Sequence, residues 1–280
     1  MKNRLLPLLL TLSLLIAAPA GAAPKTLKGN GKLVSKELPC PQSFTAVSAS
    51  RAVKVLLVDE PAGKIGIEAD ENVIDHVSVG VKGSTLQLTI DQKYTSISDI
   101  HVTITVPTDG LLTELEASSA AKIIAKTLIR GKSVELDASS TASIEASVEA
   151  GQCELEASSS GKIKADIKAE TCDMEATSAA RITAAVAVQQ CAIDLSSAGK
   201  IELTGAALNC SAEASSAAKL DASGFAAKRC TIDTSSGSKV EICCLEKLSA
   251  IASSGSSILY RGDCAINRAS TSSGGRIRKL

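Results

Sequence analysis

The sequence predicts an all-β fold, a parallel β-helix (solenoid) whose turns are about 19 residues long. A Ser-Ser doublet, once Thr-Ser, recurs at positions 118, 139, 158, 177, 196, 215, 235, 253 and 272. Apolar and polar residues alternate on both sides of each doublet, which is the pattern of a strand with one buried face. Aromatic residues make up only 1% of the chain, and this suits the narrow interior of a solenoid.

One repeat unit, Cys153 to Glu170, shows how each turn is predicted to form. Its halves CELEA and KIKADIK both alternate with period two, and only SSSG separates them. Small residues allow the chain to make a tight corner there. A crossover helix would need a unit of about 30 residues, which is longer than one period. Two strands and a corner therefore form each turn, hydrogen-bonded to the next turn at a spacing of about 4.8 Å.

Residues 1–22 have the features of a signal peptide. Lys2 and Arg4 precede an apolar stretch from Leu5 to Ala18, and Ala20-Gly21-Ala22 is an A-x-A cleavage site. The apolar stretch is shorter than the ~20 residues of a membrane span. We expect an exported protein with no integral membrane segment after signal cleavage, located in the periplasm, on the cell surface or outside the cell.

The charge balance argues against nucleic acid as a partner. The chain has 30 basic and 30 acidic residues, and no basic tract precedes the tail at 276–279. A nucleic-acid-binding domain would have a basic patch or stripe and a high isoelectric point.

The mature chain divides into an N-terminal β segment, 23–110, and a parallel β-helix array, 111–280. Residues 44–55, FTAVSASRAVKV, align with the repeat as a lone first turn, with Val47 on Leu115, Ser50 on Ser118, Lys54 on Lys122 and Val55 on Ile123. An insertion follows with alternating runs at Lys64–Ala69, His76–Val81, Thr85–Ile90 and His101–Val106. We interpret it as a β-meander that continues or caps the rod.

The opening FTAVSASRAVKVLL, the strand HVTITVP at 101–107 and the Ser-Ser-x-x-Lys-Ile turns resemble a known family from about residue 30 onward. It is the family named "putative auto-transporter adhesin, head GIN domain". Its members usually have Ser-Gly-Ser or Gly-Ser-Gly at the corner, where this chain has Ala-Ser-Ser. The resemblance implies an adhesin-like architecture and supplies no catalytic residues.

Five cysteines stand five residues before the doublet, on the apolar face of the first strand: Cys153, Cys172, Cys191, Cys210 and Cys230. We predict that they stack as an internal ladder of small apolar residues. Their Cβ atoms would be one strand spacing apart, which exceeds the ~3.8 Å typical of a disulfide. Zinc requires ligands around a point rather than along a line. The remaining cysteines leave a disulfide pair open, without indicating which: Cys40, Cys243, Cys244 and Cys264.

Two rows of charged residues flank the corner. The acidic row comprises Glu116, Asp137, Glu156, Glu175, Asp194, Glu213 and Asp233, and the basic row Lys122, Lys162, Arg181, Lys200, Lys219, Lys239 and Arg276. Such rows keep a protein soluble and prevent aggregation through its edges. The alternative is that the acidic row attracts calcium or a cationic partner, although the calcium-binding nonapeptide repeat is absent.

Other polar features have structural interpretations. The Ser rows are predicted to satisfy turn backbone groups; the alternative is that their hydroxyls face a glycan or another copy of the protein. His76 and His101 have no nucleophile motif near them. Arg261-Gly262-Asp263 spells an integrin-type tripeptide, but its place between two turns explains Gly-Asp as a corner.

Two functions compete. The first is a non-catalytic, adhesin-like scaffold of the cell envelope that contacts a protein or glycan, with a homo-oligomer left open. The second is a carbohydrate-active β-helix enzyme, a polysaccharide lyase or glycosidase, which needs clustered carboxylates and usually aromatic platforms for sugar rings. Because the acids are periodic and aromatic residues are scarce, we expect no enzyme, no catalytic residue, no cofactor and no metal site.

Overall fold

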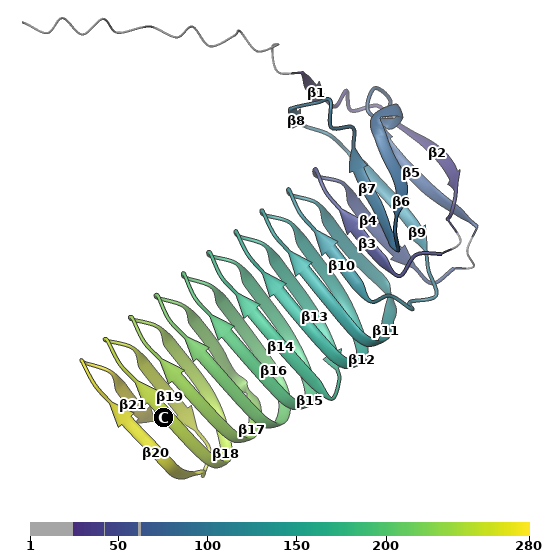
Figure 1. The fold of residues 1–280 in the computed structure, drawn as a ribbon. Coiled ribbons are helices and arrows are strands. Elements are labelled where there is room, and N and C mark those ends of the chain that lie inside the picture. The colour runs from purple at the N-terminus through teal and green to yellow at the C-terminus, as the bar shows by residue number, and fades with distance from the viewer. Residues whose placement is uncertain (1–24, 42, 61–62) are drawn as a thin grey trace, which may run out of the picture.

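The computed structural model describes residues 25–41, 43–60 and 63–280. It shows a rod of stacked coils with a more irregular β segment at its N-terminal end (Figure 1). The predicted parallel β-solenoid is confirmed. The predicted signal peptide lies outside the described residues, and the predicted domain boundaries stay predictions.

Short strands form the N-terminal segment. They are β1 (Thr26–Lys28), β2 (Leu33–Pro39), β3 (Ala46–Ala49), β4 (Lys54–Val58), β5 (Lys64–Asp70), the 3₁₀ turn η1 (Ile74–His76), β6 (Val77–Lys82), β7 (Thr85–Ile90), β8 (Ser96–Ser98) and β9 (Val102–Pro107). The alternating runs of the insertion correspond to β5, β6, β7 and β9. The sequence did not indicate β1 or β8, which pair with each other in a separate small sheet.

Within the described residues, twelve strands form the rod. They are β10 (Glu114–Ala117), β11 (Lys122–Ala138), β12 (Ser143–Ala157), β13 (Lys162–Lys168), β14 (Thr171–Ala176), β15 (Arg181–Leu195), β16 (Lys200–Ala214), β17 (Lys219–Thr234), β18 (Lys239–Ala252), β19 (Ser257–Arg261), β20 (Ala265–Thr271) and β21 (Arg276–Lys279). Six of these strands, β11, β12 and β15–β18, are long enough to bend through the side of the coil opposite the Ser corner.

Equivalent residues of successive turns pair in register. Leu155 pairs with Met174, Met174 with Ile193, Ile193 with Ala212 and Ala212 with Ile232, and all five are buried. This is the column expected from the alternation. The interior is a stack of such columns, so each turn completes the core of its neighbours.

The first turn also pairs as the alignment predicted. β3 pairs with β10 and places Val47 on Leu115, while β4 pairs with β11 and places Lys54 on Lys122. The insertion continues the strand pairing on both sides of the Ser corner beyond this turn. β7 pairs in parallel with β3 and forms a hairpin with β6, as in a meander, whereas β9 pairs in parallel with β4 and antiparallel with β5. β2 then pairs with β5.

Each Ser corner is a tight turn with two successive residues in the left-handed region. At the corner that begins with Ser215, φ is 52° for Ser216 and 62° for Ala217. The turn is closed by a hydrogen bond of 3.0 Å from the Ala218 N–H to the Ser215 carbonyl. Ala217 donates to the Ser236 carbonyl of the next turn at 3.0 Å, so the backbone ladder continues through the corner.

Candidate functional site

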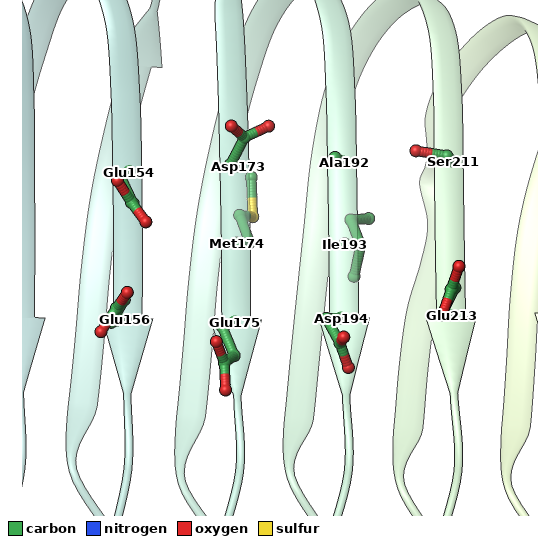
Figure 2. A pocket seen from close by; sticks show the side chains of 10 residues that line it. All are labelled: Glu154, Glu156, Asp173, Met174, Glu175, Ala192, Ile193, Asp194, Ser211 and Glu213. Atoms are coloured by element: carbon green, nitrogen blue, oxygen red, sulfur yellow. The ribbon is translucent and has the colours of Figure 1, made fainter.

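A face of carboxylates covers the strand that precedes the corner. The predicted acidic row is in register from Glu116 to Asp233, and a second column lies beside it. Together the two columns form what we call the acidic face: Glu114, Glu116, Glu135, Asp137, Glu154, Glu156, Asp173, Glu175, Asp194, Glu213 and Asp233. Figure 2 shows carboxylates of successive strands on this face, around a shallow depression of about 310 Å³.

The second column was missed in the sequence. Its members stand two residues before those of the first column, as Glu154 does before Glu156. Side chains two residues apart on a strand share a face. The repeat period predicts the first column, and the alternation within each strand predicts the second column beside it.

Burial and neighbouring carboxylates raise the pKa of three members of the acidic face. Partial burial, together with the charges of Glu114 and Glu154, raises the pKa of Glu135. Burial and the charge of Glu116 raise the pKa of Asp137. The pKa of Glu156 is raised by burial and by Glu154 in the same way. These carboxylates therefore lie close enough to disfavour one another's ionisation.

The basic row lies on the strand that follows the corner. Each member is the first residue of its strand and is exposed, and the row begins one turn earlier than predicted, at Lys54. Ser143 and Ser257 interrupt it. The acidic face and the basic row are thus separated by the width of a single tight turn.

The corner between them carries a row of serine hydroxyl groups, one row member per turn, which we call the hydroxyl crest. The second Ser of each doublet, such as Ser159 or Ser197, is exposed. The expectation that Ser side chains satisfy the turn backbone is wrong for most corners, because backbone groups of the same and the next turn do so. Ser256 is an exception: its hydroxyl accepts from the Ser253 N–H and donates to the Thr234 carbonyl.

The cysteine ladder is confirmed as a buried column of free thiols. Cys153, Cys172, Cys191, Cys210 and Cys230 pair in register and are at most 3% exposed, and Leu248 follows them in the column. The neighbouring thiol of Cys153, and burial, raise the pKa of Cys172. Such thiols are inert fillers of the core.

The histidines and the tripeptide have structural contacts. His76 Nε2 lies 2.9 Å from the Tyr94 hydroxyl, and His101 stands beside Asp70. Arg261 pairs with Glu241 at 3.2 Å, Asp263 pairs with Lys279 at 3.0 Å, and Gly262 between them has a φ of 97°.

The described residues contain neither a candidate metal site nor a candidate membrane-spanning helix. Within that part of the chain, no group of three or more His, Cys, Asp or Glu is arranged to hold a metal ion. No helix there is long and apolar enough to cross a membrane.

The stacked turns and their in-register surface rows define the class of protein: a β-solenoid that displays repeated side chains. The chain belongs to the family described as "putative auto-transporter adhesin, head GIN domain", which matches residues 43–185 and 164–264. A search of curated proteins found no significant match.

Solved structures share the fold. A "putative adhesin" from Parabacteroides merdae is 20% identical, with a TM-score of 0.68 over 91% of this chain and 99% of that one. A "putative adhesin" from Parabacteroides distasonis is 16% identical, with a TM-score of 0.70 over 91% of this chain and 100% of that one. A "putative lipid binding protein" from the same species is 19% identical, with a TM-score of 0.64 over 91% and 100%.

Proposed function

We propose that the protein is an exported, non-catalytic scaffold of the cell envelope that binds a surface protein or glycan through the repeated side chains around its Ser corner. The observation behind this proposal is that equivalent residues of successive turns pair in register. The acidic face, the hydroxyl crest and the basic row each repeat turn after turn in straight columns. A partner that contacts several turns at once gains avidity from many weak contacts.

Family membership supports the adhesin-like part of the proposal. The signal-peptide features at the N-terminus support export. Protease treatment of intact and of permeabilised cells tests the location: cleavage in intact cells indicates the surface, and cleavage only after permeabilisation indicates the periplasm.

The rival function is hydrolysis or elimination of a polysaccharide. The raised carboxyl pKa of Glu156, beside the shallow depression, is the feature that favours it. However, equivalent carboxylate neighbours recur along the rod, so no single pair is distinguished from the others. Aromatic side chains do not line the depression, and Phe225 is buried in the core.

One experiment separates the two functions. The protein is incubated with a panel of polysaccharides, and binding is measured in parallel with new reducing ends and unsaturated products. We expect binding without turnover. We also expect Glu175→Gln or Arg181→Gln to leave binding unchanged and to alter stability by less than about 0.5 kcal/mol, because neighbouring turns repeat the same chemistry. Turnover that one Asp or Glu substitution abolishes would show an enzyme.

A further inference from the structure

The acidic face and the basic row have charges that the protomer itself leaves unpaired. Ion pairs do form in residues 25–41, 43–60 and 63–280, but none of them includes a member of the acidic face or of the basic row. These two surfaces therefore have opposite charge and form no ion pair within the described residues.

Other charged columns of the same rod do pair between turns. Lys164 of β13 lies 3.5 Å from Glu145 of β12, and Lys168 lies 2.8 Å from Glu149. The solenoid geometry thus allows ion pairs from one turn to the next where the sequence alternates the signs. In the acidic face and the basic row the sign does not alternate, so neighbours along a column can only repel.

The two surfaces share one axial period. Each column advances by one strand spacing per turn, about 4.8 Å. A second rod lying alongside can therefore place a cation opposite a carboxylate on consecutive turns. The same contact between a cation of one rod and a carboxylate of the other then recurs along the interface, and such complementary charges favour a specific pairing.

Both surfaces are strongest over the same part of the rod. The acidic face has both of its columns filled from Glu114 to Glu175. Toward the C-terminal end the column beside the basic row contains Glu202, Asp221 and Glu241, which partly offset it. On β10–β15 the basic row contributes Lys122, Lys162 and Arg181, with a gap at Ser143, and no carboxylate offsets the last two in the way that Glu202 offsets Lys200. Because the acidic face lies on the same strands, two rods match without a large axial shift.

We propose that these surfaces form an interface between copies of this chain, with the acidic face of one rod against the basic row of the next. The interface is heterologous, because the two contacting surfaces differ. At each end of such an assembly, one copy still has a free acidic face or a free basic row. Further copies can therefore add sideways to form an open array, or the assembly can close into a ring. The interface uses part of the surface to which we assign ligand binding, but its test needs only the protein itself.

Two complementary variants test the interface. The first removes four carboxylates by Glu154→Gln, Glu156→Gln, Asp173→Asn and Glu175→Gln. The second removes four cations by Lys122→Gln, Lys162→Gln, Arg181→Gln and Lys200→Gln. A matched control neutralises the internally paired charges by Glu145→Gln, Glu149→Gln, Lys164→Gln and Lys168→Gln. Circular dichroism checks that each variant is folded.

Sedimentation velocity over a concentration series gives the readout. At an ionic strength of about 0.01 M, where the Debye length is ~30 Å, the wild-type protein and the control should form species larger than a monomer. Each interface variant alone should be monomeric. An equimolar mixture of the two should form a 1:1 dimer that does not grow, because only one complementary pair of surfaces remains.

Salt provides a second measurement on the unaltered chain. At about 1 M salt the Debye length falls to ~3 Å, and the wild-type assembly should dissociate. A wild-type protein that is monomeric at low salt, or a mixture that forms no dimer, overturns the proposal. So does a carboxylate variant that associates more strongly than the wild type, because the acidic face would then keep copies apart.

Discussion

The carboxylate of Asp70 accepts a hydrogen bond of 2.6 Å from the backbone N–H of His101. Its other oxygen accepts the Gly31 N–H at 2.7 Å, and the side chain is 0% exposed. Asp70 ends β5, Gly31 precedes β2 and His101 precedes β9. One buried carboxylate therefore joins three segments of the N-terminal part of the protein.

Asp70→Asn should lower the free energy of unfolding by about 2 kcal/mol, because the amide cannot replace both charged acceptors. Urea unfolding measures the change. His101→Gln keeps the backbone donor, so it should cost much less. An equal loss in the two variants would mean that the imidazole, rather than the backbone N–H, is the partner that matters.

The contribution of Asp70 also depends on pH. Burial by itself would raise its pKa, but the hydrogen bonds from the His101 and Gly31 backbone outweigh burial, and the pKa of Asp70 is lowered. Stability from this group is therefore present above the ordinary carboxyl pKa and is lost as the pH falls through the lower folded pKa.

The thiols should differ in their accessibility to alkylation. Cys40, Cys243 and Cys264 are half-buried, whereas the five ladder cysteines and Cys244 are buried. In native protein, iodoacetamide should modify the half-buried cysteines first and the five ladder cysteines only after unfolding. Peptide mass spectrometry identifies the modified positions. A ladder disulfide in native protein would contradict this prediction.

Cys191→Ala should cost roughly 1 kcal/mol, because it removes a small buried group from a column packed on both sides. Cys191→Ser should cost more, since a hydroxyl would be buried with poor hydrogen bonding. Thermal or urea unfolding gives both values. A serine variant as stable as the wild type would mean that the column holds water or polar partners.

Ala217→Gly should raise the free energy of unfolding by about 0.5 kcal/mol. Ala217 has a φ of 62°, which strains an alanine, and the corners near the C-terminal end already have Gly237, Gly255 and Gly274 at this place. The relief exceeds the entropy lost with glycine. Ala206→Gly, on an exposed site in β16, is the control and should destabilise the protein.

Glu135→Gln should stabilise the protein at neutral pH and have no effect in acid. The pKa of Glu135 is raised in the folded state, so ionisation destabilises the fold as the pH rises from the ordinary pKa through the raised one. Glu149→Gln should do the opposite, because the ion pair with Lys168 lowers the pKa of Glu149. Thermal unfolding between about pH 2 and 7, which extends well below the ordinary Glu pKa of about 4.3, compares the two.

Local patterns were sufficient to predict the rod. The period of the Ser doublets located the corners, and the alternation around them identified which residues face inward, including the cysteine ladder. The pairing of Val47 with Leu115 across the insertion also followed from alignment. These predictions held because every turn has the same local pattern and neighbouring turns differ little.

The N-terminal insertion was predictable only in part. Its strands alternate clearly, but β9 pairs with β4 and β5 rather than with β7. Asp70 shows the reason: its carboxylate joins backbone groups at positions 31 and 101, which no local pattern connects.

The sequence by itself determined the solenoid, its period, its buried columns and the single-sign acidic and basic rows, because period-two alternation fixes which face each side chain takes. Only the tertiary structure decided that neither charged surface forms an ion pair within the described part of the protomer, and that the Asp70 carboxylate joins positions 31 and 101. Those properties depend on which residues approach one another across turns and corners. Charge pairing depends on distances between side chains that are far apart in the chain, and distances are set by the folded structure.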